Sequence, residues 1–251
     1  MKCIIVTFVL CGLAAGLFAQ KPFEDSNGKW GIKAADDKII VPGRYDDAHF
    51  FTNGFAPVEL NDKWGFINTK GKEITPVKYD KANVFSGAYA QVALGGKWGL
   101  IDTTGKEVIP LKYDDPIFFS EKERLAEVGI DGKWGYIDTA GSIVIPLQYD
   151  NAGAFSEGFA RVTLNSITGF INSAGKTVIP LQYDQGFDFS DGMTNVELNR
   201  KWGYIDTKGK IVIPLQYDHA GSFYNGQATV KLDGRSFKID KSGKEIKWLN
   251  R

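Results

Sequence analysis

This sequence has few of the residues from which metal and redox sites are built. Its 251 residues include only two Cys and two His. The cysteines, Cys3 and Cys11, stand near the amino terminus, while His49 and His219 stand at different offsets from the nearest repeated Tyr. A structural zinc site takes four such ligands in close spacing. The sequence therefore predicts no metal site.

Motifs of the familiar enzyme classes are also missing. The chain contains no Gly-x-Ser-x-Gly, no P-loop and no dinucleotide-binding fingerprint. A glycosidase needs only a suitable pair of carboxylates, so a hydrolase stays as the third of three function hypotheses. We predict that the chain is not an enzyme and that it uses no cofactor.

An excess of charge of either sign is absent as well. Lys and Arg together number 30, as do Asp and Glu, and the formal net charge is zero. Nucleic-acid-binding proteins carry a surplus of basic residues, so this class is excluded. Beyond residue 19 no stretch shows helical periodicity or helix caps, and there is no low-complexity linker.

The first 19 residues have the features of a secretory signal peptide. Lys2 precedes an apolar run of about 15 residues, and the small residue Ala19 precedes the polar Gln20. The run is shorter than the roughly 20 residues of a membrane span, and a lipid anchor at Cys11 is disfavoured because Leu10 precedes it. We predict an exported protein (periplasmic, outer-surface or secreted) without a membrane span after cleavage. The mature chain then contains no cysteine and folds without a disulfide.

One unit is repeated along the rest of the chain. The pair Trp-Gly recurs at intervals of 34 residues, and once of 36, from Trp30 to Trp202, with Thr168-Gly169 as a degenerate copy. A further copy is reduced to Ser236-Phe237. Regular self-similarity at this period indicates a repeat architecture. We predict a lead-in at residues 20–27 and a repeat domain at residues 28–251, with six full repeats and a leading partial one.

The pattern within a unit predicts an antiparallel meander. In Phe55–Leu60 apolar residues alternate with variable ones, which is typical of a half-buried strand. Two residues rich in Asn, Asp and Gly then lead into the Trp-Gly strand, as in a tight hairpin. An Asx-x-x-Gly turn and a third strand follow. Since the third strand contains proline, for example Pro110, we expect it at a sheet edge, and a shorter run such as Asp80–Phe85 supplies a fourth strand.

These features resemble a known family. The string Gly-Lys-Trp-Gly-Tyr-Ile-Asp-Thr-x-Gly-Lys, followed by Ile-Pro and Tyr-Asp, is similar to the WG (KWG) repeats of bacterial WG-containing β-repeat proteins, over residues 28–246. The resemblance implies β-structured binding or scaffold modules, some of them propellers, and brings no catalytic residues. Thr168 and Ser236-Phe237 depart from the motif.

The fold class is therefore all-β, with tandem antiparallel meanders of about 34 residues. Two arrangements stay open, a β-propeller-like ring and an open twisted array. The variable positions of the first long strand favour the open array, because they look solvated on one face. These positions are Pro57, Glu59, Gln91, Ala93, Arg161, Thr163, Asn195 and Glu197.

Two repeated columns have both a packing and a binding interpretation. The Trp column is either packing between neighbouring units or a row of exposed platforms for sugar rings, and its uniform context favours packing. The Asp of each Tyr-Asp pair either caps a turn through backbone N–H groups or binds calcium, which takes six to eight oxygens. We favour the turn role. The Asp column comprises Asp46, Asp80, Asp114, Asp150, Asp184 and Asp218.

The positions at which the repeat varies are the candidate binding residues, since loops on a rigid scaffold commonly bind partners. Directly after each Tyr-Asp stand Asp47, Lys81, Asp115, Asn151, Gln185 and His219, and two residues further on stand His49, Asn83, Ile117, Gly153, Phe187 and Gly221. The leading hypothesis is a binding or scaffold protein with a protein partner. The alternative is a carbohydrate-binding envelope or surface protein.

Overall fold

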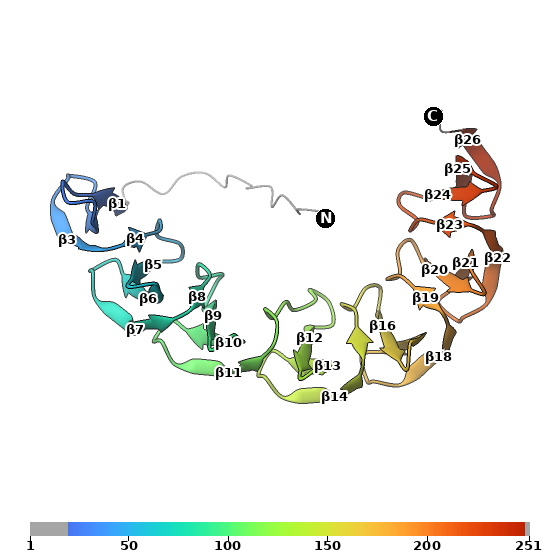
Figure 1. The fold of residues 1–251 in the computed structure, drawn as a ribbon, viewed down its shortest axis with the longest axis horizontal. Helices are drawn as coiled ribbons and strands as arrows, with labels where there is room; N and C mark the ends of the chain where they lie inside the picture. The colour runs from blue at the N-terminus through green and yellow to red at the C-terminus, as the bar shows by residue number, and fades with distance from the viewer. Residues whose placement is uncertain (1–19, 249–251) are drawn as a thin grey trace. The chain divides into compact units, whose positions relative to one another are not determined.

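The computed structural model describes residues 20–248, and all its regular elements in that range are β-strands (Figure 1). The predicted signal peptide, residues 1–19, lies outside the described residues. The all-β prediction is confirmed. The chain divides into two units. The first contains the residues up to Ala90 together with the turn Thr103–Gly105, and the second contains Gln91–Asp102 and the residues from Lys106 onward.

The strands follow one another in a regular order. Up to the first boundary they are β1 (Lys21–Glu24), β2 (Trp30–Lys33), β3 (Ile39–Tyr45), β4 (Asp47–Ala48), β5 (Phe55–Leu60), β6 (Lys63–Asn68), β7 (Glu73–Tyr79) and β8 (Lys81–Ala82). The boundary falls within β9 (Tyr89–Leu94), and β10 (Lys97–Asp102), β11 (Glu107–Tyr113), β12 (Leu125–Ile130), β13 (Lys133–Asp138), β14 (Ile143–Tyr149), β15 (Asn151–Ala152), β16 (Phe159–Leu164) and β17 (Ile167–Asn172) follow. The last are β18 (Thr177–Tyr183), β19 (Gln185–Gly186), β20 (Met193–Leu198), β21 (Lys201–Asp206), β22 (Ile211–Tyr217), β23 (His219–Ala220), β24 (Gln227–Leu232), β25 (Arg235–Asp240) and β26 (Glu245–Trp248).

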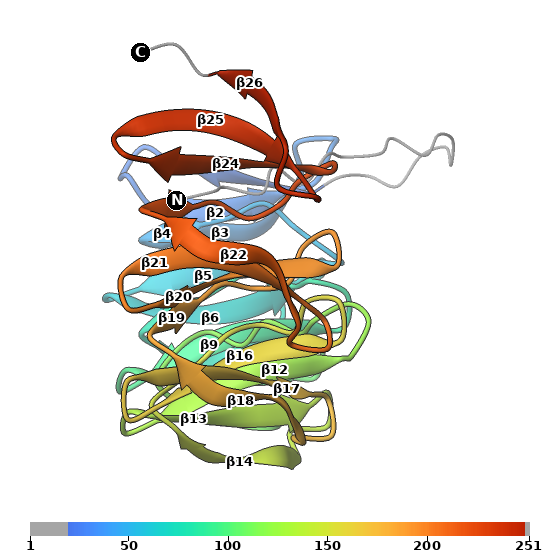
Figure 2. The ribbon, with the colours of Figure 1, turned by 90° about the vertical axis from the view of Figure 1, so that its right-hand side faces the viewer.

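Each repeat forms its own antiparallel sheet, and no sheet in the described part of the chain closes into a barrel. A complete sheet has the order short strand, two long strands and proline-containing strand, as in β19-β20-β21-β22. The strands with Pro42, Pro76, Pro110, Pro146, Pro180 and Pro214 all lie at sheet edges, as predicted. Figure 2 shows β24, β25 and β26 in the last sheet.

The residues predicted as a lead-in contain one strand of the first sheet. Lys21–Glu24 forms β1, which pairs along its whole length with β2 in a three-stranded sheet. The sheet β12-β13-β14 also has three strands. It has no short strand: the N–H of Ile117 donates to the Gln91 side chain at 2.8 Å, whereas the equivalent N–H groups of Gly153 and Gly221 donate to the neighbouring long strand. Pro116 beside Ile117 has no N–H to donate.

The predicted hairpins are confirmed by the backbone angles. Asn199 and Arg200, between β20 and β21, both have positive φ, 53° and 61°. Asn, Asp and Gly tolerate this conformation best, and two such residues give a turn whose twist matches that of the strands. The two-residue turn joins Leu198 directly to its cross-strand partner Lys201.

The glycine of the Trp-Gly pair leaves room for a bulge in the neighbouring edge strand, whose backbone lies close to it. Trp202 pairs with Tyr217 and Tyr204 with Ile213, so β22 contains extra residues at Pro214. A methyl group on Gly203 would lie 2.6 Å from the Ile213 carbonyl oxygen. In the last copy Phe237 replaces the glycine, and β26 has no proline and only one register shift.

The core lies between successive sheets. In the second unit, Tyr204 from β21, Val230 from β24 and Ile239 from β25 belong to one buried cluster. The Asx-x-x-Gly turn of one repeat also packs on its predecessor, since a methyl group on Gly209 would lie 3.2 Å from Ile179. Each sheet is therefore stabilised mainly by its neighbours.

The prediction that the variable face of the first long strand is solvated is wrong. Pro57 is buried, Ala93 is 2% exposed and Asn195 is 1% exposed. Glu59, Gln91, Arg161, Thr163 and Glu197 are half-buried. The cover comes from the neighbouring repeat, since Asn195 Nδ2 donates to the Ala220 carbonyl oxygen at 2.7 Å. The argument against a ring therefore fails, and the choice between ring and open array stays a prediction.

Candidate binding surface

The aspartate of a Tyr-Asp pair binds two other groups of the chain, a lysine ammonium group and a backbone N–H of a hairpin. We call this arrangement a clamp. Asp150 Oδ1 accepts a hydrogen bond from Lys133 Nζ at 2.6 Å, and its Oδ2 accepts one from the Asn165 backbone N–H at 2.7 Å. The same Lys–Asp pairing joins Lys29 to Asp46, Lys63 to Asp80, Lys97 to Asp114 and Lys201 to Asp218. The turn role is supported, since both carboxylate oxygens of Asp150 are engaged by the protein.

The clamps perturb the acidity of their carboxyl groups. The lysine hydrogen bond holds the pKa of Asp46, Asp114, Asp150 and Asp218 below its ordinary value. A carboxylate whose folded-state pKa lies below its unfolded value of about 3.9 stabilises the fold above that pH. The contribution is lost as the pH falls through the folded-state pKa.

We therefore expect the clamps to contribute more to stability at pH 7 than in acid. Asp218→Asn should lower the melting temperature at pH 7, and the difference from the wild-type protein should shrink as the pH falls below about 4. Thermal unfolding monitored by circular dichroism measures both. Lys201→Met, which removes the other partner, should show the same pH dependence. A difference in melting temperature that does not shrink in acid would contradict a stabilising charge on Asp218.

The tryptophans pack against the protein and are not exposed platforms. Trp202 is 6% exposed, and Trp30, Trp64, Trp98 and Trp134 are half-buried. Across the sheet, Gln185 pairs with Glu197, Glu197 with Trp202 and Trp202 with Tyr217. Directly opposed residues share a face, so a predicted binding residue and the Trp lie in one row.

The six predicted binding residues occupy equivalent places but do not form one site. Five of them begin the short strands β4, β8, β15, β19 and β23, and Asp115 follows β11 outside any strand. Asp47 is half-buried, and Lys81, Asp115, Asn151, Gln185 and His219 are exposed. Since each belongs to a different repeat, together they supply one variable contact per repeat.

Aromatic residues gather near two of these positions. The ring centroid of Trp202 lies 5.6 Å from that of Phe187 and 6.1 Å from that of His219. Phe187 is 45% exposed. In the first unit, His49 occupies the position of Phe187 and lies edge-on to Trp64 at 5.0 Å. At these two positions the second variable column therefore contacts the Trp ring.

A polar cluster lies where the Trp is lost, and the sequence interpretation missed it. Arg161 Nη1 donates to Asn151 Oδ1 at 3.4 Å, and Arg161 Nε lies 4.0 Å from Asp188 Oδ1. Among the described residues Glu127 Oε2 is buried without a hydrogen-bond partner, and burial raises the pKa of Glu127. The only indication in the sequence is Gly153, which leaves room for the Arg161 and Asp188 side chains.

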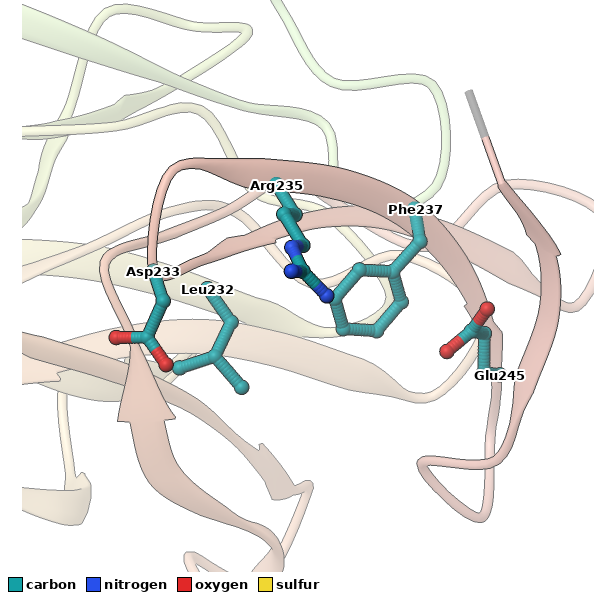
Figure 3. A pocket seen from close by; sticks show the side chains of 5 residues that line it. All are labelled: Leu232, Asp233, Arg235, Phe237 and Glu245. Atoms are coloured by element: carbon teal, nitrogen blue, oxygen red, sulfur yellow. The ribbon is translucent and has the colours of Figure 1, made fainter. Parts of the chain in front are cut away.

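A separate hollow of about 400 Å³ lies in the last sheet (Figure 3). Its lining residues are Leu232, Asp233, Arg235, Phe237 and Glu245. Arg235 and Phe237 stand two residues apart on β25 and replace the Lys and Gly of the motif. The hollow is therefore particular to one repeat. Within residues 20–248 no group of three His, Cys, Asp or Glu side chains is placed to hold a metal ion, and no helix is long and apolar enough to cross a membrane.

Solved structures resemble this chain in fold alone. A crystal structure of a eukaryotic initiation factor matches with a TM-score of 0.50 and 12% identity, over 94% of this chain and 74% of that one. Hsv2p of Kluyveromyces lactis, a β-propeller-like protein, matches with a TM-score of 0.44 and 10% identity, over 78% and 74%. PorZ of Porphyromonas gingivalis matches with a TM-score of 0.39 and 8% identity, over 93% and 38%.

No curated protein matches the chain in sequence. The family model described as WG containing repeat, by contrast, matches residues 30–64, 64–98, 98–134, 134–166, 169–202 and 202–235. This repeat fold is compatible with a binding or scaffold role. The matched segments cover most of the described residues, and the chain belongs to the WG-repeat family.

Proposed function

We propose that this chain is an exported, non-enzymatic binding or scaffold protein that contacts a protein partner. One observation carries the proposal. The residues that recur, such as Trp202, Tyr204 and Tyr217, are buried in packing, while the residue directly after each Tyr-Asp pair varies and is exposed in five of the six repeats. An array that keeps its packing and varies its surface can present a different contact in each repeat.

The proposal is tested by replacing the variable column. The mature chain serves as bait in an envelope extract, beside a variant in which Asp47, Lys81, Asp115, Asn151, Gln185 and His219 are all serine. We expect the wild-type chain to retain a reproducible protein and the variant to lose it. A control variant carries serine at Lys70, Lys208 and Lys241, which are exposed turn residues. Equal retention by all three proteins would contradict a role for the column.

Carbohydrate binding is the second candidate, and the exposed ring of Phe187 favours it. Phe187 lies beside Trp202, whose ring also lies near His219, and the polar Gln185 is on the same short segment as Phe187. Sugar rings stack on aromatic faces and take hydrogen bonds from amides. Binding to a glycan array that Phe187→Ala abolishes, while Tyr224→Ala leaves it unchanged, would favour this candidate. Tyr224 is a suitable control because it is 76% exposed.

Export itself gives a direct prediction. We expect the exported form to begin at or near Gln20, because the apolar run ends there, and to be indifferent to reductant, because no cysteine follows Cys11. Intact-mass measurement of the protein recovered outside the cytoplasm checks the start. Retention of residues 1–19 in that form would contradict the signal-peptide interpretation.

A further inference from the structure

One of the aspartate clamps lacks its lysine. The lysine stands 17 residues before the aspartate in the clamps described above, and at Asp184 that position is Ile167. Asp184 Oδ2 still accepts the Asn199 backbone N–H at 2.8 Å, as Asp150 and Asp218 do with their hairpins. The carboxylate is therefore held in the same way, and among the described residues no cation pairs with it.

At Asp184 the position of the clamp lysine holds an apolar side chain, Ile167, while the hairpin that Asp184 holds carries the exposed Arg200. Ile167 is 44% exposed and pairs across the hairpin with the half-buried Leu164. The lysine side chains at the equivalent positions are similarly exposed, 52% at Lys133 and 46% at Lys201. The site is thus open to solvent, and it combines a carboxylate with a small apolar surface.

We propose that Asp184, Ile167 and Leu164 form a docking site for a lysine side chain of the protein partner. The five internal clamps show that a carboxylate in this position binds a primary ammonium group through Oδ1. The partner's lysine would place its ammonium group on Asp184 Oδ1, and its methylene groups would cover Ile167 and Leu164. The inference rests on the proposed function, because it names one contact of that partner.

The strength of such a contact is modest and sets the scale of the test. An ion pair at a protein surface contributes about 0.2–1 kcal/mol, which corresponds to about a 1.5-fold to fivefold change in affinity. Since Ile167→Lys supplies the missing lysine from within the chain, it should occupy Asp184 and compete with any external ammonium group. Ile167→Gln removes the same apolar contact without adding a charge.

The test uses the peptide acetyl-Val-Lys-Val-amide and the same peptide with its lysine Nε-acetylated. Amide chemical shifts of Ile167 and Asn199 follow the titration, and the amides of Asp131 and Asp233, which donate to the already clamped Asp114 and Asp218, are internal controls. In the wild-type chain we expect these amide chemical shifts to change with the free lysine peptide and not with the acetylated one. We expect Ile167→Lys to bind the free lysine peptide about 1.5-fold to fivefold more weakly than Ile167→Gln does. Equal responses to both peptides, or equal affinity of both variants, would overturn the proposal.

The same variants separate this inference from the proposed function. If Ile167→Lys and Asp184→Asn bind the recovered partner with the affinity of the wild-type chain, the lysine contact is wrong and the binding role stands. If the peptide binds as expected but the wild-type chain retains no protein, the docking site stands and the proposed function is wrong. Unchanged melting temperatures of the variants would show that the fold is intact.

Discussion

Replacing Gly203 by alanine is expected to lower the free energy of unfolding by about 3 kcal/mol. The added methyl group would lie 2.6 Å from the Ile213 carbonyl oxygen and 2.7 Å from the Leu215 nitrogen. Both atoms belong to the backbone, so relief requires the proline bulge of β22 to move, and overpacking of this kind costs about 1–3 kcal/mol and sometimes more. Denaturant unfolding followed by tryptophan fluorescence measures the change.

The control for Gly203 is a glycine in an open turn. Gly95 has a φ of 60° and no atom within 4 Å of an added methyl group. At the equivalent position Asn61, Asn165 and Asn199 adopt φ between 51° and 54°. Gly95→Asn should therefore change stability by no more than about 0.5 kcal/mol. If Gly203→Ala is equally mild, the bulge is flexible and close approach does not explain the Trp-Gly pair.

The features that the sequence predicts correctly are local ones. A hairpin of two Asn, Asp or Gly residues and a proline at a sheet edge depend on backbone angles and on single N–H groups. Each can be recognised within a few residues, and the repetition shows it several times. The strand order within a sheet follows from these turns, because consecutive strands joined by tight turns are neighbours.

The features that the sequence does not predict depend on the next repeat. Asn195 is polar and stands between other variable residues, yet it is buried because Ala220 of the following sheet accepts its hydrogen bond. Alternation within one strand indicates only that two faces differ. It does not show whether a neighbouring sheet covers the polar face.

The sequence predicts only part of the candidate site, because some of its contacts join residues of different repeats. The sequence identifies the variable columns, including Gln185 and Phe187, since these positions differ between copies. It does not identify the cluster of Glu127, Arg161 and Asp188, because these residues come from three different sheets, although Glu127 and Arg161 occupy the same place in their repeats. Comparison of the repeats does show that Ile167 replaces a lysine. Only the structure shows that this lysine binds the aspartate of the Tyr-Asp pair in the other repeats.

Loss of a tryptophan is expected to have the largest effect on stability. Trp202→Ala should lower the free energy of unfolding by about 3–5 kcal/mol, because a ring that is 94% buried loses its contacts and leaves a cavity. The chain tolerates Thr168 at the equivalent position because Gly186 of the next sheet packs close to it. A methyl group on Gly186 would lie only 3.4 Å from Thr168 Cγ2. At Trp202 the residue equivalent to Gly186 is Ala220, whose methyl group prevents the next sheet from packing as closely.

The measurement that checks Trp202→Ala is hydrogen exchange, with Gln185→Ala as the control on the same row of the sheet. Gln185 is exposed and its loss should change stability by less than about 0.5 kcal/mol. Because repeats couple chiefly to their neighbours, the amides of β19–β26 should exchange faster in Trp202→Ala than in the wild-type chain. The amides of β12–β14 should keep their protection from exchange if the array is open, and should lose it if the repeats form a ring. Intact protection in β19–β26, together with loss of partner or glycan binding, would contradict the packing role and make the Trp row itself the binding surface.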